Sequence, residues 1–166
     1  MLVVVSGLPG TGKSAVAERL ASRFNAVHLS IDDIEDAMLG AGLEPGWQTG
    51  VAAYEATRAA AEQNLALGRV VVVDAVNDSD LARQTWRGAA ERRDVALRFV
   101  MLECADATEH RRRLESRQRG MRHLPEPTWD EVLDRAARYE PWTDDCVRVD
   151  SDATLETVVD AVARHL

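Results

Sequence analysis

Short apolar runs recur along the chain, and longer stretches that mix apolar with polar residues separate them. The runs have the length of buried strands rather than of helices. They occupy residues 2–5, 26–29, 70–73, 95–102 and 147–149. Each run is followed by a polar or glycine-containing segment, which is typical of a strand that ends at a loop.

The stretches between the runs are amphipathic and predict helices. These helices are expected near residues 13–23, 33–39, 50–67, from about 78, at 106–118 and at 153–164. The segment GMRHLPEP (120–127) breaks one helix, and the capping box T-W-D-E (128–131) starts another. Because strands and helices alternate, we expect a three-layer α/β/α fold with a five-stranded parallel sheet. Residues 1–166 are expected to form a single domain.

The amino-acid composition indicates a globular protein and argues against membrane-spanning and broad nucleic-acid-binding classes. With 46% hydrophobic and 29% charged residues in 166, the chain has the composition of a globular protein. No apolar run is long enough to cross a bilayer and the start has no secretory pattern, so we expect a cytoplasmic protein without membrane contact. The net charge of −8 argues against a broad nucleic-acid surface. Cys104 and Cys146 lack metal-ligand spacing and are expected to be buried free thiols.

The stretch GLPGTGKS (7–14) fits the phosphate-loop pattern G-x-x-x-x-G-K-[ST], between a predicted strand and a predicted helix. Its glycines allow backbone N–H groups to point at phosphate oxygens, and the helix N-terminus adds a positive dipole. The motif therefore predicts a nucleoside triphosphate site. Its residues are Gly7, Leu8, Pro9, Gly10, Thr11, Gly12, Lys13 and Ser14.

Lys13 is the only lysine of the chain, although Lys and Arg together number 20. A compact ammonium on a flexible stem can follow a phosphoryl group as it moves, whereas a guanidinium is wider and rigidly forked. We expect Lys13 to bind the β- and γ-phosphates and Ser14 to bind Mg²⁺. Because the chain has no second lysine, it has no guanine-reading N-K-x-D motif, and this favours ATP over GTP.

Two acidic residues follow the second predicted strand, in LSIDDIEDAM (29–38). Ligands of open parallel sheets bind at the carboxyl ends of the strands, so these residues are expected near the γ-phosphate. Asp32 is the candidate general base for an acceptor hydroxyl. The alternative is a helix cap, which is the favoured interpretation for Asp33.

The third predicted strand ends in VVVVDAVND. Asp74 is expected to bind a Mg²⁺-bound water or the serine of the loop. Asn77 is a candidate for holding the acceptor, with a simple turn as an equally good alternative.

The stretch 109–123 carries six arginines and two glutamates, and its last arginines lie at the predicted helix break. We expect part of it to form a lid, about 109–127, that neutralises the transferred phosphoryl group and excludes water. Arg119 and Arg122 are better candidates for this role than Arg111 and Arg112, which are expected on a solvated turn.

Three tryptophans have separate interpretations. Trp47 lies in the glycine-rich stretch GLEPGWQTG, which we expect to be a flap over the acceptor. Trp129 and Trp142 are expected to pack the lid helix onto the sheet.

The order GLPGTGKS, SIDD, VVVDAVN and RQRGMRHLP resembles small P-loop kinases of the polynucleotide 5′-kinase, chloramphenicol phosphotransferase and zeta-toxin type. The resemblance implies strand order 2-3-1-4-5, with Asp32 as general base and Arg119 in the lid. It also implies paired roles for Asp74 and Asn77. Polynucleotide kinases place an arginine three residues after the base, where this chain has Glu35. An acid at that position favours a neutral or cationic acceptor over a nucleic-acid end.

These observations predict an ATP- and Mg²⁺-dependent kinase that phosphorylates a hydroxyl of a small molecule. Its predicted acceptor side comprises Asp32, Glu35, Trp47 and Asn77. Two alternatives remain open at this point, namely a polynucleotide 5′-hydroxyl kinase and a nucleotide-binding regulatory ATPase with little turnover.

Overall fold

The structure is a computed structural model that describes residues 1–166. Its strands are β1 (Leu2–Ser6), β2 (Val27–Ser30), β3 (Val71–Ala75), β4 (Leu97–Glu103) and β5 (Cys146–Asp150). They form one sheet in the order β2-β3-β1-β4-β5, and every neighbouring pair is parallel. The predicted sheet and its strand order are confirmed. The carboxyl ends of β1 and β3 are therefore neighbours, as the predicted contact between the phosphate loop and Asp74 requires.

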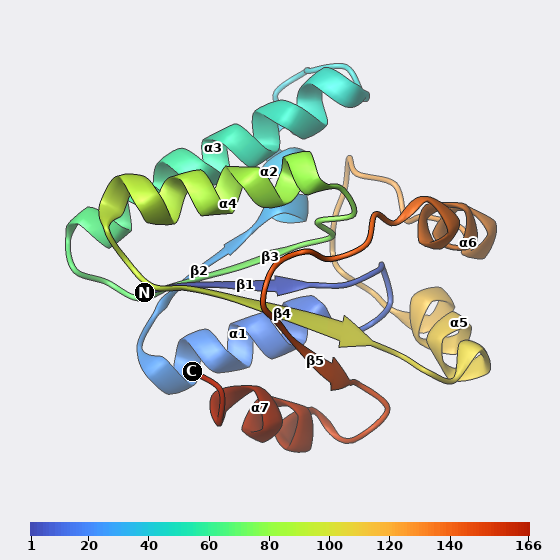
Figure 1. The fold of residues 1–166 in the computed structure, drawn as a ribbon. Helices are drawn as coiled ribbons and strands as arrows, with labels where there is room; N and C mark the ends of the chain where they lie inside the picture. The colour runs from blue at the N-terminus through green and yellow to red at the C-terminus, as the bar shows by residue number, and fades with distance from the viewer.

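Helices cover both faces of this sheet (Figure 1). They are α1 (Lys13–Phe24), α2 (Ile31–Gly40), α3 (Trp47–Ala66), α4 (Asp80–Arg93), α5 (Ala107–Ser116), α6 (Trp129–Arg138) and α7 (Leu155–Ala163). In Figure 1, α1 and α7 lie on one face and α2, α3 and α4 on the other. The helices α5 and α6 lie beyond the carboxyl ends of the strands, where the ligand of a parallel sheet binds.

Two hydrophobic cores result from the alternation of side chains along the strands. In β1, Leu2 and Val4 join the core under α3 and α4, whereas Val3 and Val5 join the core over α1 and α7. All four are completely buried. A strand buried on both faces needs an uninterrupted apolar run, and this explains why the strand pattern of the sequence is not alternating.

The segment that follows α6 returns across the sheet and is anchored on α4. The completely buried Arg83 donates hydrogen bonds to the carbonyl oxygens of Pro141 (2.9 Å) and Glu140 (3.1 Å). Its guanidinium also lies 4.6 Å from the ring centroid of Trp142, which packs edge-on against Phe99 of β4 at 5.2 Å. Trp142 thus packs on the sheet as predicted, but it follows the lid helix rather than belonging to it.

Element boundaries differ from the predictions at three places that matter for the site. Helix α2 begins directly after β2, so Asp32 lies in its first turn. Trp47 is the first residue of α3 rather than part of an irregular flap, because Gly46 before it adopts a φ of 154° and ends the loop. Helix α5 ends at Ser116, where Arg117 turns to an extended conformation, so Arg117 lies with Arg119 in the loop and not on the predicted helix.

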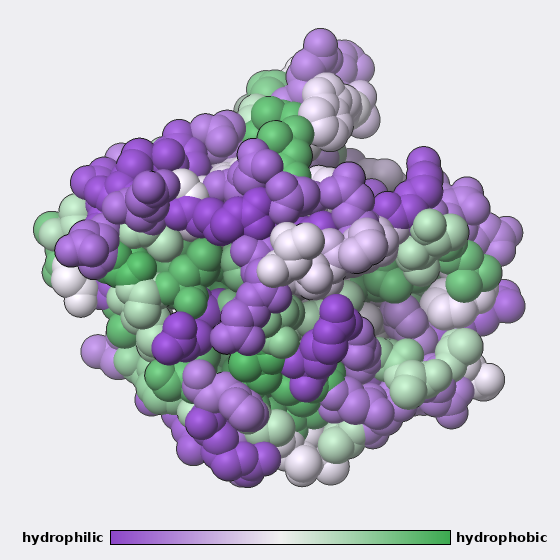
Figure 2. Space-filling model, viewed as in Figure 1, coloured by the Kyte–Doolittle hydropathy of each residue, from purple (hydrophilic) through white to green (hydrophobic).

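The distribution of hydrophilic and hydrophobic residues on the surface is consistent with helices that cover the sheet. Figure 2 shows that the outer side of α4 is hydrophilic, whereas hydrophobic surface is exposed on α3 where it rises above α4. The thiols of Cys104 and Cys146 are free, as predicted, but only partly buried. None of the helices combines the length and the apolar character needed to cross a membrane.

Candidate active site

The phosphate loop connects β1 to α1 and has a fixed backbone shape. A Cβ atom at Gly7 would lie 2.6 Å from the Thr11 hydroxyl oxygen and 2.7 Å from the Leu102 carbonyl oxygen, so no larger residue fits. The hydroxyl of Thr11 donates to the Leu8 carbonyl at 2.9 Å. From α5, the imidazole Nε2 of the buried His110 lies 2.8 Å from the Pro9 carbonyl oxygen. The loop is therefore held in shape without a ligand.

Lys13 begins α1 and is 3% exposed. Burial lowers the pKa of its ammonium group, and the charges of Asp32 and Asp74 oppose this shift only in part. A buried ammonium without a direct partner is costly, and an anion at the loop would compensate it. The helix N-terminus favours an anion at the same place. This half of the site is therefore electrostatically suited to phosphate.

Ser14 and Asp74 lie together at the ends of neighbouring elements. The Ser14 hydroxyl donates to Asp74 Oδ1 at 2.8 Å, and Asp74 Oδ2 lies 2.7 Å from Nε2 of His28 on β2. Burial lowers the pKa of His28, but the hydrogen bond and charge of Asp74 outweigh burial, so the pKa is raised. A hydroxyl and a carboxylate are the hard oxygen donors that Mg²⁺ prefers, with water and phosphate completing its shell. The residues present therefore fit a magnesium ion.

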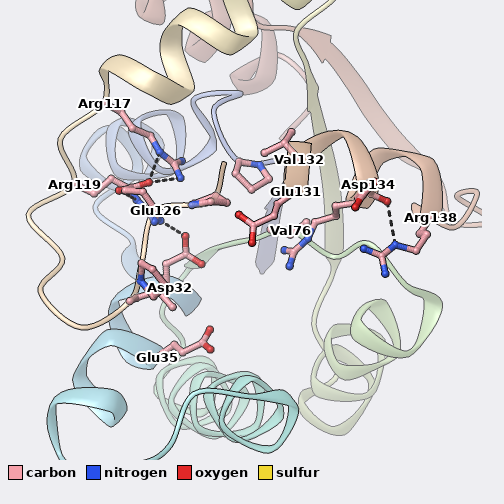
Figure 3. A pocket seen from close by; sticks show the side chains of 15 residues that line it. Asp32, Glu35, Val76, Arg117, Arg119, Glu126, Glu131, Val132, Asp134 and Arg138 are labelled. Atoms are coloured by element: carbon pink, nitrogen blue, oxygen red, sulfur yellow. Dashed lines mark hydrogen bonds and ion pairs between the residues drawn. The ribbon is translucent and has the colours of Figure 1, made fainter. Parts of the chain in front are cut away.

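Asp32 and the lid meet across a short distance. The Arg119 guanidinium donates through Nη1 to Asp32 and through Nε to Glu126 Oε1 at 2.7 Å. The Nε of Arg117 donates to the other oxygen of Glu126 at 2.8 Å. Figure 3 shows these four side chains gathered at one side of the cavity. Two guanidinium groups thus approach the site from the lid loop, and one of them is paired with the candidate base.

The lid loop is also docked on α2 through its backbone. Asp36 Oδ1 accepts N–H groups of Arg122 (3.1 Å), His123 (2.7 Å) and Leu124 (2.7 Å). These hydrogen bonds lower the pKa of the Asp36 carboxyl. Because Asp32 and Asp36 are one turn apart on α2, the same helix holds both the arginine and the backbone of the lid.

Two cavities meet at Asp32. The first, of about 420 Å³, lies between Pro9, the lid loop and α6. The second, of about 550 Å³, lies between α2, the start of α3 and the start of α4. Both are lined by Asp32, Glu35, Val76 and Arg135. Asp32 therefore faces the space beside the phosphate loop and a separate space large enough for a small molecule.

Residues 2–141 match the sequence model of a family described as AAA domain, AAA_33. The chain belongs to this family. The match covers the phosphate loop, the Asp32 region, Asp74 and the lid, so each element of the site just described lies within the AAA_33 domain. No curated protein matches the sequence.

Solved structures share the fold of this AAA_33 domain. A Chloroflexus aurantiacus protein provisionally assigned as a kinase superimposes with a TM-score of 0.79 at 19% identity, covering 99% of this chain and 97% of its own. A Sinorhizobium meliloti gluconokinase gives 0.67 at 22% identity, with coverage of 98% and 91%. Chaetomium thermophilum Kti12, in complex with ADP-AlF3, gives 0.68 at 19% identity, with coverage of 99% and 98%. The fold is that of P-loop kinases.

The structure separates the predicted site residues of the AAA_33 domain into two groups. Asp32, Glu35 and Trp47 line the second cavity, and Arg119 lines the first. Arg122 is exposed and lines neither cavity. Asp33 also lines neither, and no side-chain hydrogen bond caps α2, so its predicted capping role is not seen.

Asn77 is placed inside the protein rather than at the acceptor. Its side chain is completely buried, donates through Nδ2 to the Ser6 hydroxyl at 2.8 Å and accepts from Trp86 Nε1 at 2.8 Å. Its φ of 55° is in the left-handed region, where asparagine is favoured. The amide therefore fixes the loop after β3, and its burial keeps it out of both cavities.

Three residues of the site have no signal in the sequence. His28 lies within a predicted strand, His110 within an arginine-rich helix, and Arg117 one turn before the predicted break. Trp129, predicted to pack on the sheet, instead lies edge-on against His110 at 5.1 Å. It thereby links α6 to α5 and to the phosphate loop. For Arg117, the sequence offered one indirect indication, because this residue falls within the predicted lid at 109–127.

Proposed function

We propose that this AAA_33 domain is an ATP- and Mg²⁺-dependent kinase that transfers the γ-phosphoryl group of ATP to a hydroxyl of a small molecule. The observation that carries the proposal is the position of Asp32 at the junction of two cavities, one beside the phosphate loop and one beyond it. A kinase needs a group between nucleotide and acceptor, whereas a site that only binds nucleotide does not. In this proposal residues 1–166 act as one domain, with 109–127 as its lid.

The chemistry assigned to the chain is a single displacement. The loop N–H groups and Lys13 bind the β- and γ-phosphates, and Arg119 neutralises charge on the transferred group. Asp32 accepts the proton of the acceptor hydroxyl, whose oxygen forms a bond to the γ-phosphorus as the bond to the β,γ-bridging oxygen breaks. Magnesium, bound by Ser14 and Asp74 with the phosphates, supplies further charge neutralisation.

The resting contact between Asp32 and Arg119 has a place in this proposal. While a carboxylate oxygen of Asp32 accepts a hydrogen bond from Arg119, it cannot also accept one from the acceptor hydroxyl in the same direction. Phosphate oxygens of bound ATP would compete for Arg119 and release Asp32. The base would then become available only when the donor is in place.

The acceptor side favours a small molecule over a polynucleotide end. The second cavity has the volume of ordinary ligand sites. Its shared residue Glu35 would repel a phosphate, and the chain carries a net charge of −8. The gluconokinase among the structural neighbours acts, by its name, on a small hydroxyl compound.

A second candidate is a regulatory ATPase, which needs a nucleotide site but no acceptor; the structural neighbour Kti12 was solved with a nucleotide complex, ADP-AlF3. Asp32→Asn distinguishes the two, with Asp33→Asn as the matched neighbour that lines neither cavity. We expect Asp32→Asn to bind ATP with near-normal affinity in calorimetry and to lose about 10²- to 10⁴-fold in phosphoryl transfer to the best acceptor of a hydroxyl-compound panel. Asp33→Asn should retain most of the transfer. If no acceptor accelerates ATP consumption by the unmodified protein, the regulatory function is supported instead.

A further inference from the structure

The second cavity has an unequal distribution of charge. Four carboxylates line it, on Asp32, Glu35, Glu55 and Asp78, and the only basic residue in the lining is Arg135. Three of these carboxylates have a basic partner. Asp32 pairs with Arg119, Glu55 with Arg58 at 2.7 Å, and Asp78 with Arg135 at a longer 3.5 Å. The cavity therefore contains no free basic group that could bind an anionic acceptor.

Glu35 differs from the other three because it has neither an ion pair nor a side-chain hydrogen bond. It lies three residues after Asp32 on α2. Figure 3 shows both carboxyl groups pointing into the first cavity, and the same two residues also line the second. Burial and then the charge of Asp32 raise the pKa of Glu35, against a smaller opposing effect of Arg135. A carboxylate in this situation is stabilised by any cation that binds beside it.

The outer wall of the same cavity is apolar. Trp47 and Val51, one turn apart on α3, are 74% and 39% exposed, and Leu81 at the start of α4 is 61% exposed. Hydrophobic surface on α3 is visible above α4 in Figure 2. Exposed large apolar side chains that gather at the edge of a cavity are typical of a binding surface. A tryptophan ring face also attracts cations that lie within about 6 Å of its centre.

We propose that the phosphate acceptor is a hydroxyl compound that carries an ammonium group and an apolar group, with Glu35 binding the ammonium and Trp47 the apolar part. This proposal rests on the proposed kinase function. Residues three apart on a helix have Cβ atoms about 5–6 Å apart, so Asp32 and Glu35 can contact a hydroxyl and an amine on neighbouring carbons. The acceptor class is thus an amino alcohol with an apolar substituent.

The test uses three compounds that share a phenyl-bearing skeleton and differ in charge. They are phenylalaninol, which carries an ammonium group, N-acetylphenylalaninol, which is neutral, and phenyllactate, which is an anion. Binding of each is measured by calorimetry with ADP and Mg²⁺ present. We expect phenylalaninol to bind at least about tenfold more tightly than the other two, as one favourable charge contact of this kind provides.

Two variants and one control assign the binding preference to residues. Glu35→Gln should reduce the advantage of phenylalaninol to within about threefold, because the neutral amide keeps the shape and removes the charge. The matched control Glu44→Gln changes an exposed glutamate that does not line the cavity and should leave the preference intact. Trp47→Ala should weaken binding of phenylalaninol and of its acetylated form alike. Equal or weaker binding of phenylalaninol, absence of binding at millimolar concentration, or an unchanged preference in Glu35→Gln overturns the proposal.

Transfer of labelled γ-phosphate from ATP to the same three compounds, in separate samples, separates this proposal from the kinase function. Transfer that is most efficient for the neutral or anionic compound leaves the kinase function standing and overturns the amino-alcohol assignment. A Glu35-dependent preference in binding, without transfer to any acceptor, supports the assigned cation site and contradicts the kinase function.

Discussion

The phosphate-loop half of the site and its acceptor half are built in different ways. Around the loop, Gly7, Thr11, Lys13 and Asp74 are buried, and the loop is hydrogen-bonded to α5 through His110. On the acceptor side, Trp47 is exposed, Glu35 has no partner and Asp32 is paired with a lid arginine. One half is fixed before its ligand arrives, whereas the other contains groups whose partners the ligand would supply.

The difference follows from what each half must recognise. The phosphate groups of the nucleotide are the same in every turnover, so buried backbone N–H groups can be fixed for them in advance at no later entropic cost. The acceptor must enter, bring its hydroxyl to Asp32 and leave again. Exposed apolar and unpaired charged groups suit that task, at some expense of stability.

The largest expected effect on ATP binding and catalysis comes from substitutions of Lys13 in the phosphate-loop half, the fixed half of the site. We expect Lys13→Ala and Lys13→Arg to lose ATP binding and to lower kcat/KM by at least about 10³-fold, because Lys13 is buried and the wider guanidinium cannot be accommodated. Calorimetry with ATP and Mg²⁺ measures the first quantity and a coupled assay the second. If Lys13→Arg binds ATP normally, the loop is less rigid than the comparison requires.

The second prediction concerns Arg119, the lid arginine that lies between the phosphate loop and the acceptor cavity. Arg119→Gln should lower kcat by about 10²-fold with little change in ATP affinity, because Arg119 gives up its ion pair with Asp32 when it binds the phosphate of ATP and contributes most to the transferred group. Arg111→Gln is the matched control, since Arg111 is exposed on α5 and pairs only with Glu115. A large loss of ATP affinity in Arg119→Gln would assign this arginine to the fixed half instead.

The sequence predicted residues of both halves, and the residues that it missed share a physical cause. The strands, their order and the loop GLPGTGKS follow from patterns in which each residue type has a local cause, such as a strand buried on both faces or a glycine too crowded for a Cβ. His28, His110 and Arg117 act through contacts with residues that are distant in sequence. Such contacts leave no local pattern. Arg119 and Arg122 were preferred over Arg111 and Arg112 by their position at the helix break, and the folded loop places Arg117 and Arg119, but not Arg122, at the first cavity.

Asn77 shows that a residue predicted for the acceptor belongs to the fixed half. We expect Asn77→Ala to lower the free energy of unfolding by about 3 kcal/mol, because two buried hydrogen bonds are lost and alanine is strained at positive φ. Asn25→Ala is the control, because Asn25 also has a positive φ of 49° but is exposed, and it should cost only about 1 kcal/mol. Urea unfolding measures both. Equal losses would mean that strain alone accounts for the effect.

The smallest expected effect concerns Glu35 in the acceptor half. Removing its charge should raise the stability of the fold, whereas the Asn77 substitution lowers it. Burial and the charge of Asp32 raise the pKa of Glu35 in the folded state. Between the unfolded and folded pKa values the folded protein therefore binds more protons than the unfolded chain, so stability falls as pH rises through this range. The cost is fully present at neutral pH and absent below the unfolded pKa. Solvent screening keeps it small.

Glu35→Gln should therefore raise the Tm at neutral pH by about 1–2 °C, and the gain should disappear as the pH falls below the ordinary glutamate range. Glu44→Gln, at an exposed position, should show no such pH-dependent gain. Thermal unfolding at a series of pH values, without nucleotide, measures the difference between the two variants. A loss of stability in Glu35→Gln at neutral pH would mean that Glu35 has a partner in the resting protein. The acceptor half would then be as fully paired as the phosphate loop, and the contrast between the two halves would not hold.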